Sequence, residues 1–258
     1  MENAIAWIFI FPLFGSVFVA LSRYVNIKLA YPISVLSMAG ALWAGVETLQ
    51  QAMASPNHEI SYLLGGWTLD LYPRGVGIEF RADLLASLIA LIVLGVGLLV
   101  TVYSKIHVEK ETPNKEAIYY SLMMLQITGL AGICLTGDAF NLYVLIEVAA
   151  LTGYGLIAMG SNRAAAATYN YLILGPIGAS LYLLGVGYLY IKTGTLNITS
   201  NTVNGTGTAF TSEIETGDVI IITDDSSQFN QLKFTVASVI IVVVIAAVVV
   251  VVVVVVVV

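Results

Sequence analysis

One carboxyl side chain lies inside a long apolar stretch of this sequence. Glu147 is the single acidic residue between Phe140 and Met159. If a membrane-spanning helix begins at Phe140, Glu147 lies roughly 10 Å along its axis, about 5 Å short of the middle of a ~30 Å hydrocarbon layer. An ionisable group at that depth costs about 2.5–3.5 kcal/mol, which calls for a compensating role. We interpret Glu147 as a proton- or cation-exchanging group. The alternative is a neutral carboxyl bonded to another helix.

Three further residues are placed to support Glu147. Tyr143 and Tyr154, four residues before it and seven after it, fall on the same helical stripe. This predicts that Glu147 faces a packed and partly hydrated interior and not lipid. Asp138 directly precedes the apolar run, where a short carboxylate accepts hydrogen bonds from free N–H groups and suits the positive end of a helix. We therefore expect a structural role for Asp138.

The composition indicates a protein that folds in a bilayer. Of the 258 residues, 59% are hydrophobic and 10% are charged, whereas soluble domains carry about 25% charged residues. One cysteine and two histidines are too few for a disulfide scaffold or a Cys/His metal site. The sequence has no basic surface for nucleic acid and no phosphate-loop, dinucleotide, haem or nucleophile motif. We expect no cofactor, no metal and no nucleic-acid partner.

Six apolar runs are each long enough to cross a bilayer, which takes about 20 residues. They are 4–22, 32–51, 84–103, 117–135, 140–159 and 167–190. A more polar segment, about 53–80, follows the second run, and its Gly and Pro residues predict a loop with room for a short hairpin. The fold class that follows is an all-α polytopic membrane protein with six transmembrane helices.

Lys and Arg are distributed unequally between the two sets of alternate loops. One set holds six and the opposite set holds three. The six are Arg23, Lys28, Lys105, Lys110, Lys115 and Arg163, and the three are Arg74, Arg81 and Lys192. Because cytoplasmic loops collect basic residues, we place the N-terminus outside a prokaryotic inner or plasma membrane.

The composition changes after Asn197. Residues 198–233 are rich in Thr, Ser, Asn, Gly and Asp and alternate like a small β-region, with a turn expected at Asn204-Gly205. Residues 234–258 are Val-rich and end in eleven consecutive valines, which leave no small residues to seat a neighbouring helix. We interpret 198–233 as foreign to the preceding part and the tail as an assembly or frameshift artefact. The alternative for the tail is a seventh span.

Other polar or small residues near the spans favour structural roles. Glu47 lies near the end of the second span, which favours a boundary charge, and Arg81 and Asp83 flank the third span as interfacial anchors. Gln126 and Thr128 lie within the fourth span, where such groups more often bond across helices than line an ion route. Glycines in the sixth span indicate close helix packing; they are Gly175, Gly178, Gly185 and Gly187.

The residues from Gly137 to Glu147 form the pattern Gly-Asp-x-Phe-Asn-Leu-Tyr-Val-x-x-Glu. This pattern resembles the fifth-helix motif of a family of antiporter-like membrane proteins. The family comprises subunits of respiratory complex I, the D component of Mrp-type cation/proton antiporters, and subunits of membrane-bound hydrogenases. Residues 171–197 are similar to that family's sixth helix and its exit. Residues 65–86 contain short matches to its second-to-third helix connection. The resemblance covers about residues 1–197.

The resemblance implies the first half of a subunit with about fourteen helices and two inverted five-helix repeats. In that family the fifth-helix Glu exchanges protons and is paired with a Lys on the seventh helix. Only Glu147 has a counterpart here, because Lys233 stands in a foreign context and is not assigned. Where the family often has a basic residue before the Tyr-Leu of its sixth helix, this chain has Asn170.

The function that we expect is a proton-translocating, or cation/proton antiport, membrane subunit of a multi-subunit respiratory-type complex. Its partners would be other membrane subunits, the lipid bilayer and protons, with sodium as the second candidate ion. The chain itself has no redox centre or catalytic motif, so enzyme activity would belong to an NADH:quinone oxidoreductase-like or hydrogenase-like assembly. The alternatives are a structural membrane subunit without a transport role and a nonfunctional truncated product.

Overall fold

The computed structural model describes residues 4–64, 78–160, 163–193, 195–199 and 202–206. Six of its helices are long and apolar enough to cross a membrane, which confirms the predicted fold class. These helices are α1 (Ala4–Val25), α2 (Ala30–Ala54), α3 (Leu84–Tyr103), α5 (Glu116–Leu135), α6 (Ala139–Ala158) and α7 (Ala164–Thr193). Two short helices, η1 (Ile27–Leu29) and α4 (Lys105–Glu111), follow α1 and α3 respectively.

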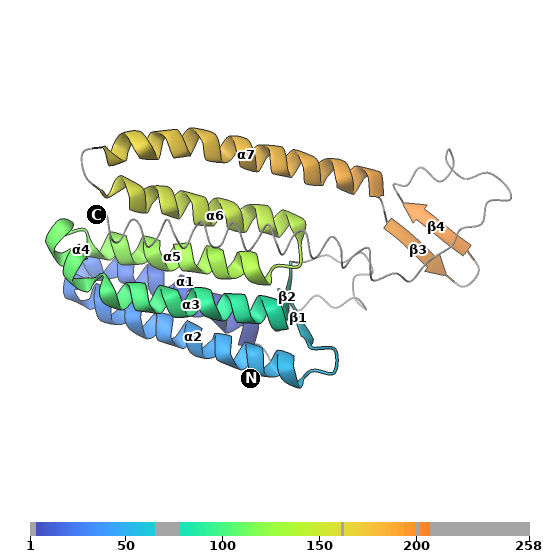
Figure 1. Ribbon diagram of the computed structural model, residues 1–258, viewed down its shortest axis with the longest axis horizontal. Coiled ribbons are helices and arrows are strands. Elements are labelled where there is room, and N and C mark those ends of the chain that lie inside the picture. The colour runs from blue at the N-terminus through green and yellow to red at the C-terminus, as the bar shows by residue number, and fades with distance from the viewer. Residues whose placement is uncertain (1–3, 65–77, 161–162, 194, 200–201, 207–258) are drawn as a thin grey trace.

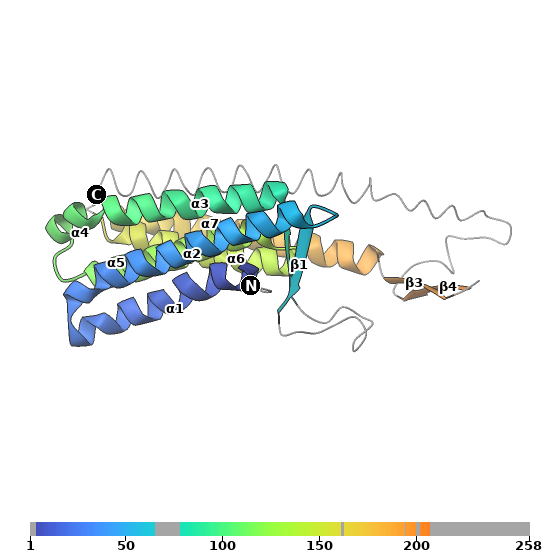
Figure 2. The ribbon, with the colours of Figure 1, turned by 90° about the horizontal axis from the view of Figure 1, so that it is seen from below.

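The long helices lie lengthwise against one another, with α5 at the centre (Figures 1 and 2). This helix contacts α1, α2, α3 and α6. Fifteen of its twenty residues are buried, including Met123, Met124 and Leu130. In contrast, α7 packs on α6 at the edge of the bundle, and Ala179 is the one buried residue among its described side chains. The core is therefore built around α5, with α6 as the layer between the core and α7.

Large apolar side chains cover the outer faces of the bundle. On α1 they include Phe14 and Phe18, on α3 Leu99, and on α7 Leu174 and Leu184, all of which are more than half exposed. A soluble monomer rarely exposes contiguous apolar area on this scale. Hydrocarbon or further apolar helices are the environments that such faces fit, as expected for a multi-pass membrane protein.

Several helices extend past the limits of the predicted spans by up to three residues, whereas α3 matches its span and α6 is shifted by one residue. For example, α2 begins two residues before the second predicted span and ends three residues after it. Hydropathy marks the part of a helix that crosses hydrocarbon, whereas the backbone hydrogen-bond ladder continues into the interface. Glu47 lies about two turns before the end of α2 and is half-buried.

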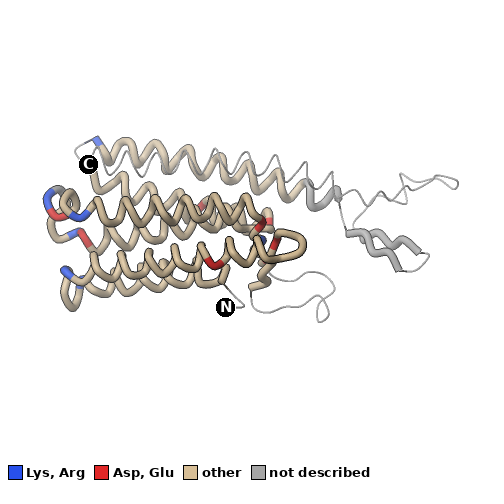
Figure 3. Tube along the Cα trace, turned by 60° about the horizontal axis from the view of Figure 1, so that its bottom comes forward, with Lys and Arg blue, Asp and Glu red and all other residues tan. Residues whose placement is uncertain are grey.

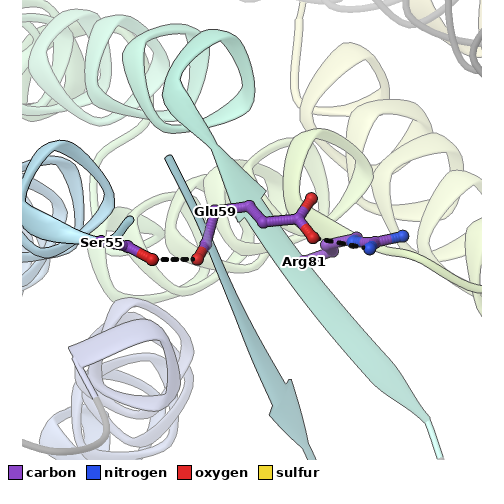
Figure 4. Close-up of polar contacts among 3 residues, drawn as sticks. All are labelled: Ser55, Glu59 and Arg81. Carbon is purple, nitrogen blue, oxygen red and sulfur yellow. Dashed lines mark hydrogen bonds and ion pairs between the residues drawn. The ribbon is translucent and has the colours of Figure 1, made fainter. Parts of the chain in front are cut away.

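A β-hairpin covers one end of the bundle. Strands β1 (Glu59–Leu63) and β2 (Glu79–Asp83) pair antiparallel, and the Arg81 guanidinium lies 2.8 Å from the Glu59 carboxylate (Figure 4). The Ser55 hydroxyl donates to the backbone carbonyl of Glu59 at 2.9 Å. Both charged side chains are about one-third exposed, so the ion pair contributes at most about 1 kcal/mol. Arg81 thus anchors the hairpin.

Asp83 has a different anchoring role, at the start of α3. Its carboxylate accepts a hydrogen bond from the backbone N–H of Ala86 at 2.6 Å. A short carboxylate in this position satisfies one of the free N–H groups of the first helical turn. The predicted interfacial role of Asp83 is therefore that of an N-cap.

A second hairpin follows α7. Strands β3 (Thr195–Thr199) and β4 (Thr202–Thr206) pair antiparallel, with Asn204 opposite Asn197 and Gly205 opposite Leu196. The turn predicted at Asn204-Gly205 is therefore wrong, because both residues lie within β4. The chain reverses between Thr199 and Thr202, since the partner strand already begins at Thr195, before the change in composition. The rest of the predicted β-region, from residue 207 on, and the Val-rich tail fall outside the described residues.

The two ends of the bundle differ in charge (Figure 3). The basic end is formed by the α1–α2 turn, α4 with the start of α5, and the α6–α7 connection. It carries Arg23, Lys28, Lys105, Lys110, Lys115 and Arg163, together with the acids Glu109 and Glu116. Among the residues whose side chains the structure describes, the hairpin end carries Arg81 and four acids; they are Glu59, Glu79, Asp83 and Asp138. The predicted orientation depends on an excess of Lys and Arg in one set of alternate loops, and those loops lie together at the basic end.

Candidate functional site

The start of α6 is fixed by a network of short hydrogen bonds. The Asp138 carboxylate accepts from the backbone N–H of Phe140 at 2.8 Å, which confirms the predicted N-cap. The Asn141 side-chain amide donates to the Thr136 hydroxyl at 2.9 Å, closing the α5–α6 turn from the helix side. These bonds define where α6 begins, and hence the height at which its side chains lie.

Strand β2 braces the same turn. The backbone N–H of Gly137 donates to the carbonyl of Glu79 at 2.9 Å, and Phe80 forms a β-bridge with Thr136. A Cβ at Gly137 would lie 3.4 Å from that carbonyl and 3.5 Å from Cβ of Arg81, an ordinary contact distance. The hairpin therefore rests directly on the connection that positions α6.

Replacing Asp138 by Ala is expected to destabilise the protein by about 1 kcal/mol, because the first turn of α6 loses its cap. Thermal unfolding of the chain in detergent measures this change. Asp138→Asn is the matched control, since an amide oxygen still accepts the Phe140 N–H bond and should retain most of the stability. Equal losses in the two variants would assign the effect to charge and not to capping.

Close packing against α5 fixes the rotation of α6. A Cβ on Gly129 would lie 3.0 Å from the backbone nitrogen of Ala149, so the two helices touch at their backbones. One turn further along, the Thr152 hydroxyl donates to the Gln126 side-chain oxygen at 2.8 Å, with both residues buried. The predicted cross-helix bond of Gln126 is confirmed.

Thr128 behaves differently from Gln126. Its hydroxyl donates to the Met124 carbonyl of its own helix at 2.8 Å, so a cross-helix bond was the wrong prediction for this residue. A hydroxyl on Cβ easily reaches the carbonyl one turn back, whereas the longer Gln side chain extends to the neighbouring helix.

Glu147 lies on the side of α6 that faces away from α5. Ala149 and Thr152 contact α5, and at 100° per residue Glu147 is turned roughly 160° from Ala149. It lies about 12 Å along a helix of about 30 Å, close to the midpoint of α6. The side chain is half-buried, next to an exposed stripe that includes Val144 and Leu151.

Tyr154 is brought close to Glu147, and Asp138 is not. Tyr154 follows Glu147 by two turns on the same side of α6, and long side chains lean toward the helix N-terminus, so its phenol extends toward Glu147. Tyr143 is half-buried on the same side of α6, one turn before Glu147. Asp138 lies at the helix end, roughly 13 Å from Glu147 along the axis, where it serves the cap. The site therefore consists of Glu147, Tyr143 and Tyr154.

One contact of this site was not predicted from the sequence. The Tyr154 hydroxyl occupies the position that a Cβ on Gly175 of α7 would take. The glycine itself was predicted to permit close packing, but its partner was not named. In the described part of the chain, Gly178, Gly185 and Gly187 have open space beside them, so the close packing expected at these three positions is not seen there.

Within the described residues, the ion pair that forms is Arg81–Glu59, at the hairpin end, and Glu147 is not part of it. The same part of the chain has no cluster of three His, Cys, Asp or Glu side chains that could hold a metal ion. Cys134 is buried, and its thiol donates to the Leu130 carbonyl at 3.2 Å. The chemistry available at the site is therefore that of a carboxyl group with neighbouring phenols.

No family model matches the sequence. Curated relatives do match. Over 185 residues the chain is 38% identical to NADH-quinone oxidoreductase subunit N of Desulforudis audaxviator, a match that covers 70% of this chain and 36% of the relative. It is 36% identical over 136 residues to the D component of the Na⁺/H⁺ antiporter of Bacillus subtilis, covering 52% of this chain and 26% of the relative. The chain is a homologue of the antiporter-like membrane subunits.

Solved structures support the antiporter-like fold. A chain of the archaeal membrane-bound sulfane sulfur reductase complex aligns with a TM-score of 0.67 and 29% identity, covering 76% of this chain and 39% of that one. A chain of the Mrp complex from Dietzia sp. aligns with a TM-score of 0.58 and 24% identity, covering 73% and 34%. The antiporter-like chain described here spans about a third or less of the curated relatives' lengths.

Proposed function

We propose that this chain is part of an ion-translocating membrane subunit, in which Glu147 takes up and releases protons. The observation that carries the proposal is a half-buried carboxyl group at the middle of an apolar, membrane-length helix, turned away from the core helix α5. The curated relatives support it, since one is named as part of an antiporter and the other as part of a quinone oxidoreductase.

The energetic cost of Glu147 supports an exchange role. A carboxylate at the centre of a bilayer costs about 2.5–3.5 kcal/mol, while protonation removes the charge and most of that penalty. The two protonation states therefore differ in the environment that they prefer. A small change in hydration or in neighbouring charge then suffices to load or unload the proton. This is the physical basis on which one carboxyl can couple ion movement to a conformational change elsewhere in an assembly.

The chain works with other membrane subunits, as its homologues do. Within the proposal, protons are the transported ion, and a second cation such as sodium is the antiport alternative. The bundle lies in a prokaryotic cell membrane with its basic end in the cytoplasm and its N-terminus outside. The charge separation between the two ends supports this orientation.

The proposal is tested by measuring proton uptake in vesicles that contain the chain assembled with its partner subunits. Loss of uptake in Glu147→Gln is the expected result. Uptake equal to that of the unchanged assembly would leave Glu147 with a structural role in helix packing.

The orientation is tested with single cysteines in a Cys134→Ala background. A membrane-impermeant maleimide added to intact cells should label His58→Cys, next to the hairpin, and should label Lys28→Cys, at the basic end, only after permeabilisation. Both positions are exposed in the structure, so accessibility of the side chain itself is matched. The opposite labelling pattern would invert the proposed topology.

A further inference from the structure

The contact between Tyr154 and α7 joins the candidate site to the outermost helix. The Tyr154 hydroxyl fills the notch left by the missing Cβ of Gly175, so this position on α7 accommodates the phenol only because it is glycine. The ring of Tyr154 also stacks on Tyr171, with 6.5 Å between the ring centroids and 19° between the planes. Two contacts from one side chain thus hold α6 against α7.

The same side chain points toward Glu147. Tyr154 follows Glu147 by two helical turns on one side of α6, and long side chains on a helix lean toward its N-terminus. The phenol therefore extends along the helix in the direction of the carboxyl group. Tyr154 therefore extends from the side of α6 that carries Glu147 to α7.

The notch lies at a weak point in the backbone of α7. Pro176 follows Gly175 and has no backbone N–H, so the carbonyl of Leu172 lacks its usual helical donor. Helices bend most readily at prolines, because one rung of the hydrogen-bond ladder is missing. The Tyr154 hydroxyl thus contacts α7 beside the part of the helix that yields most easily.

We propose that Tyr154 is a positioning residue for Glu147, holding the carboxyl by a hydrogen bond through one bridging water, while it seats α6 in the Gly175 notch of α7. The proposal rests on the proposed function. A carboxyl that changes charge changes the strength of this hydrogen bond, because bonds to a charged acceptor are stronger. The charge state of Glu147 is thereby transmitted to α7 beside Pro176.

Infrared spectroscopy of the whole chain in lipid nanodiscs tests this proposal. The difference between the spectra of the unchanged chain and of Glu147→Gln identifies the absorption band of the Glu147 side chain. The position of this band shows whether the group is a protonated carboxyl or a carboxylate. In Tyr154→Phe this band is expected to shift, because the group loses its hydrogen-bond donor. Tyr171→Phe is the matched control: its ring keeps the stacking contact, and its hydroxyl is not the one in the Gly175 notch.

A second variant gives an independent readout. Gly175→Ala places a methyl group where the Tyr154 hydroxyl lies, so it should displace the phenol and shift the same band. The double variant with Tyr154→Phe should shift the band no further than Tyr154→Phe alone. The amide bands of the same spectra report whether each variant keeps its helices.

An unmoved Glu147 band in Tyr154→Phe, or an equal shift in Tyr171→Phe, would overturn the positioning role. That result is distinguishable from failure of the proposed function. If Glu147→Gln loses proton uptake but the Glu147 band does not move in Tyr154→Phe, only the positioning role of Tyr154 is contradicted. Unchanged uptake in Glu147→Gln removes the transport role, whatever the spectra show.

Discussion

Glu147→Gln is expected to lower proton uptake by the assembled complex by about a hundredfold, in the range for loss of a group that takes up and releases a proton. Gln has nearly the same shape as a protonated Glu and keeps its hydrogen-bonding atoms, but it does not ionise. The variant should therefore fold and assemble normally, so that the loss falls on transport alone. Uptake is measured as the pH change inside sealed vesicles.

Two controls sharpen this result. Glu147→Asp keeps an ionisable carboxyl but shortens the side chain, so partial uptake is expected. Glu47→Gln removes the other half-buried carboxyl that lies inside a long helix, on α2, and should leave uptake unchanged. A comparable loss in Glu47→Gln would show that the effect comes from removing any intramembrane acid, and would contradict the role given to Glu147.

Gly129→Leu is expected to destabilise the bundle by about 1–3 kcal/mol or more, because the added side chain has no space. A Cβ at this position would already lie 3.0 Å from the nitrogen and 3.2 Å from Cα of Ala149, and backbone atoms cannot rotate out of the way. The helices α5 and α6 must separate, which also breaks the Thr152–Gln126 hydrogen bond. Unfolding in detergent with increasing denaturant measures the loss.

Gly178→Leu is the matched control for this prediction. It makes the same chemical change in a long apolar helix, but none of the described residues lies within 4 Å of the Cβ that it adds. Its stability should be unchanged or slightly higher, since Leu favours helix more than Gly does. Similar losses in both variants would mean that the Gly129–Ala149 contact does not hold α6 in place.

The helical part of this fold was predictable because length and hydropathy act locally. A run of about 20 apolar residues needs no knowledge of its neighbours to be recognised as a membrane span. The cap at Asp138 was predictable for the same reason, since it depends on adjacent residues only. The turn at Asn204-Gly205 was predicted from local propensity and was wrong, because the partner strand begins earlier in the chain than the change in composition suggests.

Sequence patterns did not predict which residues from distant segments would contact each other. Arg81 and Glu59 are 22 residues apart and meet only because β1 and β2 pair in one register. Tyr154 and Gly175 meet because α6 and α7 are antiparallel and pack at a particular height. Glu147 itself was identifiable, since a single acid in an apolar run is conspicuous without any knowledge of what surrounds it.

The central place of α5 has a consequence for how the chain is made. Ribosomal synthesis delivers α1, α2 and α3 to the membrane before α5, yet α5 is the helix that contacts all three. Until it arrives, those earlier spans lack the neighbour around which they are arranged. Completion of the core is thus a late step of biogenesis, and a pause or defect in the segment Glu116–Leu135 would leave three inserted helices held only by the α1–α2 and α2–α3 contacts.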